Sequence, residues 1–316
     1  MRDIPRSSAL TLIAGALAAA RPASAQTAPP VVRVGATAID ACGVAYYGVE
    51  NGMFLNAGIN VQVTTLNNGA SIMAAVSSGD LDVGMTNTPQ LAVAIARGIP
   101  FQMIAPASLY SKKDADPNLV VAKDGPIKSA RDLVDATIGV SSLGDFNQLS
   151  VLGWFDANKV PHDRVKFVEL KFGEMGAALQ RGTVQAAILT EPAKSDAIRA
   201  GQIRDLADTY ISIAPEIATI VWFSTKPWVQ KNPDLARKLV GEIYTIAKWA
   251  NANPRDTAPI LAKVAKIDPA VVATLLRRIY ATTNDRRYVE AILTLAGRYG
   301  MLAHPLTFED YSAYSG

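Results

Sequence analysis

Two stretches of the chain align with each other without a gap, and this internal repeat is the feature that most limits the fold. Residues 74–98 read AAVSSGDLDVGMTNTPQLAVAIARG, and residues 177–201 read AALQRGTVQAAILTEPAKSDAIRAG. Each copy has the pattern of a helix, a glycine turn, a buried strand, a polar loop that ends in proline, and a second helix. Two such units predict two similar α/β lobes, although two βα units could also align by chance. The identical pairs are Ala74/Ala177, Ala75/Ala178, Gly79/Gly182, Pro89/Pro192, Ala94/Ala197, Ile95/Ile198 and Gly98/Gly201.

A second pair of matching loops lies upstream of each copy. The predicted strand 33–35 runs into Ala36-Thr37-Ala38, and the predicted strand 137–139 runs into Val140-Ser141-Ser142, each before a helix. Four loops that match in order and in type favour two lobes, each with two strand-to-helix loops. Because ligands of open α/β sheets bind outside the carboxyl ends of the strands, we expect all four loops to surround one cleft.

The rest of the chain indicates α/β architecture with largely parallel sheets. Short apolar runs alternate with amphipathic stretches, and 316 residues with 49% hydrophobic content can bury the cores of two domains. After Lys226 only helical periodicity remains, as in 235–250 and 289–302, which predicts a helical C-terminal segment packed on the lobes. The predicted strands are 31–36, 59–66, 81–85, 101–105, 119–122, 137–141, 165–169, 184–189 and 217–224.

The N-terminal segment 1–25 has the pattern of a cleaved secretory signal peptide. Arg2 and Arg6 precede the apolar stretch 9–20, and Ala23-Ser24-Ala25 is a small-residue cleavage site. The alternative is a buried N-terminal helix, which the extended, proline-rich sequence that follows disfavours. No later segment is long and apolar enough to span a bilayer. We therefore expect a periplasmic protein.

Charge and cysteine content exclude other classes. The formal net charge is +3, and the densest basic clusters are the pairs Arg277-Arg278 and Arg286-Arg287. We interpret both pairs as solvated helix faces rather than as a nucleic-acid patch, so no nucleic-acid partner is expected. Cys42 is the only cysteine, which rules out a disulfide within the chain, and it lies too far beyond the cleavage site to carry a lipid anchor.

Polar residues of the four loops are the candidate ligand contacts. Pro89 and Pro192 fit the first position of a helix, where a missing N–H costs no hydrogen bond, so Thr88 and Glu191 are the predicted N-caps. The N–H groups that follow such caps bind carboxylate, sulfonate or phosphate oxygens. Alternatively, Thr88 and Glu191 only cap their own helices. The predicted ligand-binding residues are Thr37, Asp40, Asn87, Thr88, Ser141, Ser142, Gly144, Asp145, Thr190, Glu191 and Trp222.

Three aromatic residues have two interpretations each. Tyr46 and Tyr47 follow the first loop, where they fit a half-buried helix as well as they fit a ligand-stacking role. Trp222 lies in the strand that returns the chain to the first lobe, so it either lines the cleft near the hinge or fills a core. The core is the favoured position for Trp222.

Catalytic and metal-binding patterns are sparse. His162 and His304 each lie in a proline-adjacent loop, far in sequence from Cys42 and from any acidic cluster. The sequence has no HxxH or CxxC spacing, no GxSxG, no GxxxxGK and no GxGxxG after a strand. We therefore expect no cofactor, no metal and no enzymatic activity.

Six segments together resemble the solute-binding proteins of ABC importers that serve nitrate, taurine and alkanesulfonates, aromatic acids and thiamine-pyrimidine precursors. The resemblance covers nearly the whole mature chain. Its most specific parts are the G-x-F-x-x-x-G-[IL]-x-V motif at 52–61, the G-x-x-D-[VI]-G motif at 79–84 and the pair Glu191-Pro192. The segments are VRVGATA, YYGVENGMFLNAGINVQV, NGASIMAAVSSGDLDVGMTNTP, SARDLVDATIGVSS, LQRGTVQAAILTEP and FSTKPWVQKNPDLARKLVGEIYTIAKWANANP.

The resemblance implies a type II periplasmic-binding-protein fold with two crossovers between the lobes. Lobe I is expected to comprise 31–116 and 222–316, and lobe II 117–221. The implied protein is a monomer that traps a small molecule at the hinge and docks in its closed form on the transmembrane subunits of an ABC permease.

The nature of the ligand stays open between two classes. A small organic anion, such as a sulfonate or an aromatic carboxylate, fits the helix starts, but the four loops contain no arginine. The carboxylates of Asp40, Asp145 and Glu191 would repel an anion unless they are turned away or paired. A neutral nitrogenous heterocycle such as a pyrimidine precursor is therefore the alternative ligand, and an enzyme acting on a pyrimidine-like substrate is the alternative of another class.

Overall fold

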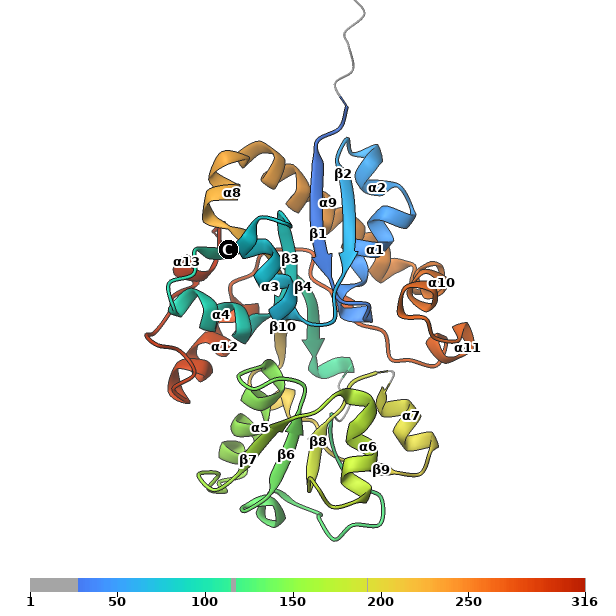
Figure 1. Ribbon diagram of the computed structural model, residues 1–316, viewed down its shortest axis with the longest axis vertical. Helices are drawn as coiled ribbons and strands as arrows, with labels where there is room; N and C mark the ends of the chain where they lie inside the picture. The colour runs from blue at the N-terminus through green and yellow to red at the C-terminus, as the bar shows by residue number, and fades with distance from the viewer. Residues whose placement is uncertain (1–27, 115–117, 192, 316) are drawn as a thin grey trace, which may run out of the picture.

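The computed structural model describes residues 28–114, 118–191 and 193–315. The predicted signal peptide and Pro192 lie outside these residues. Two β-sheets, each covered by helices on both faces, form two lobes that lie one above the other in Figure 1. This two-lobed α/β architecture confirms the predicted fold class. We call the first sheet with its helices lobe I and the second sheet with its helices lobe II.

Lobe I is a six-stranded mixed sheet in the order β11-β4-β10-β3-β1-β2. The strand β1 pairs in parallel with β2 and β3, whereas β10 runs antiparallel to β3 and β4, and β11 runs antiparallel to β4. The strands are β1 (Val31–Ala36), β2 (Asn60–Thr65), β3 (Val83–Asn87), β4 (Phe101–Ser111), β10 (Glu216–Thr225) and β11 (Ile279–Tyr280).

Two helical layers enclose this sheet, because its strands are apolar on both faces. One face carries α1 (Gly43–Glu50), α2 (Met53–Asn56), α9 (Pro233–Ala252), α10 (Pro254–Ala265) and α11 (Pro269–Val272). The other face carries α3 (Gly69–Ser78), α4 (Thr88–Ala96), α12 (Arg287–Arg298) and α13 (Phe308–Tyr311). The short helix α8 (Lys226–Lys231) connects β10 to α9.

Lobe II is a five-stranded sheet in the order β7-β6-β8-β5-β9. Its strands are β5 (Leu119–Ala122), β6 (Thr137–Val140), β7 (Lys166–Glu169), β8 (Ala186–Ile188) and β9 (Ile203–Ala207). The helix α5 (Phe146–Ala157) covers one face, and α6 (Phe172–Gln180) and α7 (Ala193–Arg199) cover the other. The 3-10 helices are η1 (Asp40–Cys42), η2 (Lys112–Asp114), η3 (Ala130–Leu133) and η4 (Tyr210–Ser212).

The glycines of the internal repeat occupy equivalent turns in the two lobes. Gly79 and Gly182 end the helices α3 and α6 with φ of 83° and 71°, and Gly98 and Gly201 follow α4 and α7 with φ of 84° and 68°. Only glycine adopts these left-handed conformations without strain. The repeat therefore marks the same βα unit in each lobe, as its sequence predicts.

Three features of the chain differ from the sequence-based expectation. The strand β9 was not predicted, and β11 shows that the segment after Lys226 is not purely helical. The whole of β10 pairs within the sheet of lobe I from Glu216 onward, so the division expected between 221 and 222 falls inside this strand. The chain passes from β4 of lobe I to β5 of lobe II, and it returns to lobe I in a second crossover at 208–215.

Apolar packing joins the lobes along one side. Phe146 and Leu149 of α5 belong to the same core as Leu91 of α4 and Ile292 of α12. Beyond this core, the hydroxyl of Tyr299 donates to Asp156 Oδ2 at 2.5 Å. The helix α5 of lobe II is thus anchored on lobe I (Figure 1).

Candidate functional site

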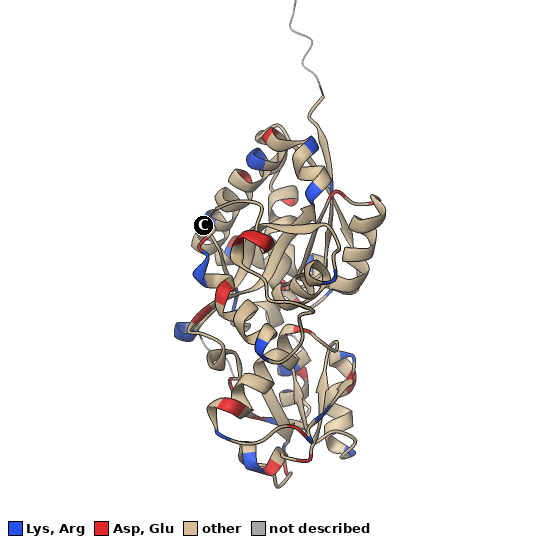
Figure 2. Cartoon of the chain, turned by 90° about the vertical axis from the view of Figure 1, so that its left-hand side faces the viewer, with Lys and Arg blue, Asp and Glu red and all other residues tan. Residues whose placement is uncertain are grey.

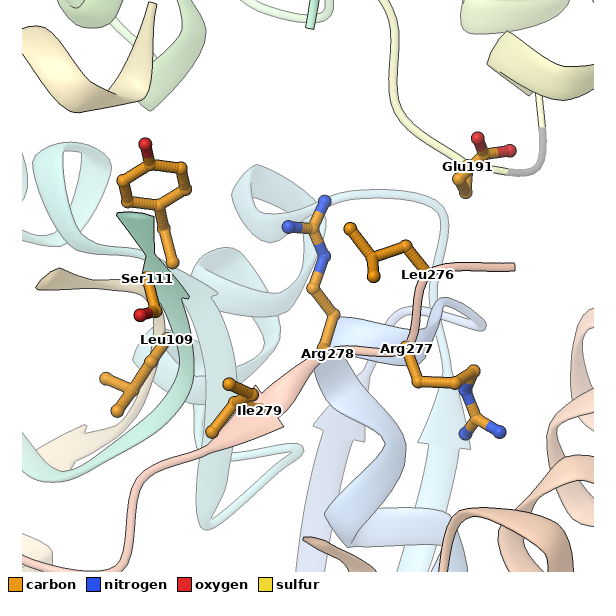
Figure 3. Close-up of a pocket in the computed structure, with 8 residues that line it drawn as sticks. Leu109, Ser111, Glu191, Leu276, Arg277, Arg278 and Ile279 are labelled. Carbon is orange, nitrogen blue, oxygen red and sulfur yellow. The ribbon is translucent and has the colours of Figure 1, made fainter. Parts of the chain in front are cut away.

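A pocket lies between the lobes, at the end of β4 and beside the segment that leads into β11. Leu109, Tyr110 and Ser111 of β4 and the segment 276–279 form its lobe I wall, and Glu191 faces them from lobe II (Figure 3). Tyr110 also donates its hydroxyl to Asp208 Oδ2 at 2.6 Å in the second crossover. The pocket therefore adjoins the hinge and is made by both lobes.

Arg278 supplies the positive charge of this pocket. In Figure 3 its side chain extends into the space between the lobes, whereas that of Arg277 points the other way. Among the residues that the structure describes, none forms a hydrogen bond or an ion pair with the Arg278 guanidinium. Its charge acts on the second crossover: burial raises the pKa of Tyr210 to about 12, and Arg278 acts against that rise. An arginine side chain without a protein partner can bind an anionic ligand.

Arg277 is engaged by the protein itself. Its Nε and Nη2 atoms donate to Asp40 Oδ2 and Oδ1 at 3.0 and 2.9 Å. The hydroxyls of Tyr47 and Tyr280 donate to the same Oδ1 atom at 3.0 and 2.8 Å. The interpretation of the Arg277-Arg278 pair as a solvated helix face is wrong, because both residues lie in the extended connection between α11 and β11.

Asp40 is an ionised carboxylate at the centre of this network. Burial alone raises the pKa of Asp40, but the hydrogen bonds and charge of Arg277, the backbone N–H of Arg278 and the hydroxyl of Tyr280 together hold that pKa below its usual range. Only 14% of the side chain is exposed. Its negative charge is paired within lobe I. Asp40 is one of the three carboxylates that were expected to repel an anionic ligand, and this pairing reduces that repulsion.

The start of α4 differs by one residue from the prediction. Asn87, not Thr88, is the N-cap, and its Oδ1 accepts from the N–H of Gln90 at 3.0 Å. Thr88 is fully buried and donates its hydroxyl to the carbonyl of Ala218 at 2.6 Å. The Gln90 N–H, expected to be free for a ligand, is occupied. Asn87 lies half-buried at the carboxyl end of β3.

The loop before α5 forms a closed set of hydrogen bonds. Asp145 caps α5 by accepting from the N–H of Gln148 at 2.9 Å, and it accepts from the Ser141 hydroxyl at 2.5 Å. Gly144, at φ 73°, donates its N–H to Gln148 Oε1 at 2.8 Å. Ser142 donates to Glu169 Oε1 at 3.2 Å. These four predicted residues are thus brought together, and the bonds described here join them to one another or to Gln148 and Glu169 of the same lobe.

Asp145 has an unusual environment for a carboxylate. Burial raises its pKa to about 6, although hydrogen bonds from Ser141, Gln148 and Asn147 act in the opposite direction. Asn147 continues the network by accepting from the hydroxyl of Tyr210 at 2.8 Å. This cluster lies on the hinge side of lobe II, because Tyr210 stacks edge-on against Tyr110 of the pocket at 5.6 Å.

Glu191 combines two roles at the start of α7. Its Oε2 accepts from the N–H of Ser195 at 3.2 Å, as expected of a cap, while its side chain lines the pocket (Figure 3). Thr190 is half-buried beside it and accepts from the N–H of Lys194 at 3.1 Å. Glu191 thus forms a capping bond and also lines the pocket, and its contact with a ligand stays a prediction.

The aromatic residues lie in the core of lobe I. Trp222 and Tyr47 are fully buried, and Tyr46 is 8% exposed and donates its hydroxyl to the carbonyl of Ala36 at 3.1 Å. These positions correspond to the core alternative for Trp222. Thr37 lies half-buried after β1, and its carbonyl accepts from the N–H of Ile39 at 2.9 Å.

The pocket thus contains one predicted residue, Glu191, and three important ones that sequence reasoning missed. Tyr110 belongs to a strand predicted to end at 105, and Leu276 and Arg278 belong to a segment interpreted as helical. The adjacent arginines were visible in the sequence, but no local pattern shows that one of them points into a cleft.

The described ranges lack the features of a metal site and of a membrane span. Those residues contain no group of three or more His, Cys, Asp or Glu side chains able to hold a metal ion. Among the described helices, none combines the length and the apolar character needed to cross a membrane. Charges of both signs are interspersed on the side shown in Figure 2.

Comparisons with known proteins converge on one group. A family model described as NMT1/THI5 like matches residues 42–257. The taurine-binding periplasmic protein of Escherichia coli (strain K12) is 26% identical over 206 residues, which make up 65% of this chain and 62% of that relative's length. These matches confirm the resemblance to the solute-binding proteins of the nitrate, taurine and sulfonate group.

Solved structures agree on the fold. The periplasmic aliphatic sulphonate binding protein SsuA from Escherichia coli superposes with a TM-score of 0.73 at 16% identity, over 90% of this chain and 97% of that one. The desulfurization enzyme DSZB superposes with a TM-score of 0.65 at 15% identity, over 90% and 96%. The fold is therefore one that binding proteins and an enzyme both use.

Proposed function

The chain belongs to the NMT1/THI5-like family, and on that premise we propose that it is the periplasmic solute-binding protein of an ABC importer for a small organic anion. A sulfonate or an organic carboxylate is the favoured ligand. The name of the taurine-binding relative and the two-lobed fold support the transport role. Export by the predicted signal peptide, a monomeric state and delivery to a membrane permease belong to the same proposal.

One observation supports the choice of an anion above the others. Arg278 extends into the pocket between the lobes without a partner among the described residues, and Asp40, which would oppose an anion, is neutralised by Arg277. A half-buried guanidinium binds sulfonate or carboxylate oxygens by charge-assisted hydrogen bonds, often two at a time. The four loops contain no arginine, and the C-terminal segment supplies one instead.

Glu191 favours a second, related ligand class. Its carboxylate lies opposite Arg278 across the pocket, and a carboxylate accepts hydrogen bonds from ligand N–H groups. A nitrogenous heterocycle, or an anion that also carries a nitrogen donor, would use this residue.

Closure of the lobes couples ligand binding to recognition by the permease. A ligand held by Arg278 of lobe I and Glu191 of lobe II makes contacts in the closed state that the open state lacks, so binding shifts the population toward closure. A permease that recognises the closed state then receives only loaded protein.

Ligand binding by the mature protein, starting at Gln26, tests the proposal. Isothermal titration with taurine, 1-butanesulfonate, benzoate and a pyrimidine separates anions from neutral heterocycles. Assay of the same mixtures for new products tests the alternative that the chain is an enzyme. Product formation without stabilising binding contradicts the transport role.

Replacing Arg278 tests the anion anchor directly. Because the variant loses a charge-assisted hydrogen bond, Arg278→Ala is expected to raise the Kd of the best-binding anion by about tenfold or more. Arg286→Ala serves as the control, since Arg286 pairs with Glu290 and Glu309 on the surface. Equal Kd values for wild type and Arg278→Ala contradict the anion anchor.

A further inference from the structure

The segment that presents Arg278 lies between two hollows. On one side is the pocket between the lobes, and on the other is a cavity of about 380 Å³ bounded by α9, α10 and the segment itself. Ala250, Asn251, Pro254 and Thr257 line that cavity. Because neither side of the segment is filled by close apolar packing, polar bonds must fix its position.

Two side chains, Asp40 and Asn251, bond the backbone of the segment, and Arg277 of the segment also donates to the Pro254 carbonyl and the Thr257 hydroxyl, each at 3.2 Å. Asp40 Oδ2 accepts from the backbone N–H of Arg278 at 2.8 Å and from Arg277 Nε at 3.0 Å. Asn251 pairs with the backbone of Tyr280, accepting from its N–H at 2.9 Å and donating to its carbonyl at 2.8 Å. Asp40 therefore holds the segment where it faces the pocket, and Asn251 holds it two residues later.

We propose that Asp40 is a positioning residue that determines which of the two adjacent arginines faces the ligand. The proposal rests on the role of Arg278 in anion binding. Neighbouring side chains of an extended backbone point to opposite sides. By engaging the guanidinium of Arg277 and the N–H of Arg278 together, Asp40 fixes the register of the segment, so that Arg277 turns away and Arg278 points into the pocket (Figure 3).

Asp40 forms more hydrogen bonds than an ion pair with Arg277 alone would provide. The hydroxyl of Tyr280 donates to both Asp40 Oδ1 and the Asp40 carbonyl, at 2.8 and 2.7 Å, and Tyr47 donates to Oδ1. Both oxygens of the carboxylate are thus saturated by donors of lobe I. Asp40 acts on the ligand only through Arg278.

The test combines a measurement without ligand and one with 1-butanesulfonate. Because Asp40→Asn removes the charge that pairs with Arg277 and leaves one acceptor oxygen in place of two, the variant is expected to speed amide exchange at Arg278 by about tenfold or more, while Tyr280, held by Asn251, changes little. The Kd for 1-butanesulfonate is expected to rise by about tenfold in the wild-type background and less than about twofold in the Arg278→Ala background.

Asp82→Asn is the matched control. Asp82 accepts from the backbone N–H, Nε and Nη2 of Arg33 in the same pattern as Asp40, but at the other end of the sheet. This variant is expected to lose stability without a change in Kd. If Asp40→Asn does not fold, Tyr280→Phe, which removes the hydroxyl that bonds the Asp40 carbonyl and Oδ1, takes its place in the cycle.

Three results are decisive. Unchanged amide exchange at Arg278 overturns the inference, and so does a Kd that rises by the same factor in both backgrounds, because a general loss of structure is additive. If Arg278→Ala itself has no effect on the Kd, the proposed anion anchor fails instead, and the exchange data alone decide whether Asp40 positions the segment.

Discussion

At the scale of single residues, the pKa values of the two buried aspartates near the site are shifted in opposite directions. Asp40 is surrounded by cationic and hydroxyl donors that overcome burial and lower its pKa, whereas Asp145 has only neutral donors, and burial raises its pKa to about 6. The sequence shows both residues in polar loops, but it shows no difference between them. That difference depends on Arg277, which lies 237 positions beyond Asp40 in the chain.

The raised pKa of Asp145 predicts a pH dependence of stability. A folded-state pKa near 6 against an unfolded value near 3.9 means that folding favours the protonated form, so this contribution is full at low pH and is lost as the pH rises to about 6. The free energy of unfolding of wild type, relative to Asp145→Asn, is expected to fall by about 2 kcal/mol between pH 4 and pH 6.

Urea denaturation of both proteins across this range measures the difference. Asp132→Asn is a control of opposite sign, because backbone and side-chain hydrogen bonds from Lys128 and Ser129 lower the pKa of Asp132. A difference between wild type and Asp145→Asn that does not vary with pH contradicts the assignment.

At the scale of elements, the sequence predicts strands well where hydrophobic runs are continuous. The strands β1 and β5 have the predicted bounds, and the repeated glycines end the predicted helices. The strand β9 was missed because two charged residues interrupt its sequence, IRDLA, at an edge of its sheet, and β11 because two residues carry no periodicity. The cap of α4 was misplaced by one residue, since Asn87 and Thr88 are both good caps and only the fold buries Thr88.

The observed cap of α4 makes a prediction about stability. Because Asn87 satisfies the N–H of Gln90, Asn87→Ala is expected to lower the free energy of unfolding by about 1 kcal/mol. Thermal or chemical unfolding measures the loss, with Lys171→Ala as the control at the start of α6, where the side chain makes no capping bond. Equal losses in the two variants would show that the Asn87 cap contributes nothing specific.

At the scale of the whole molecule, the site results from contacts that no local pattern encodes. Glu191 and Arg278 face each other although they belong to different lobes, and the C-terminal segment supplies the charge that the four loops lack. The two-lobed fold could be predicted from the repeat and the family resemblance, but of the pocket residues only Glu191 could be predicted. The lobes also share a core through α5, α4 and α12, which limits how they can move.

The shared core predicts an asymmetric motion in which the α5 side stays closed and the Glu191 side opens. The bond between Tyr299 and Asp156 then persists in both states, so Tyr299→Phe is expected to lower the free energy of unfolding by about 1 kcal/mol and to leave the ligand Kd within about twofold. Chemical denaturation and titration measure the two effects. A large change in Kd would mean that this contact breaks during closure.

The burial of Cys42 has a practical consequence for following that motion. Its thiol is 1% exposed, and burial raises its pKa to about 12, so almost no reactive thiolate exists at neutral pH. A fluorophore attached to an introduced cysteine at position 276, where Leu276 is 47% exposed on the pocket wall, would label that site without removal of the native cysteine. The chain is thus suited to serve as the scaffold of an optical sensor for a ligand that binds in this pocket.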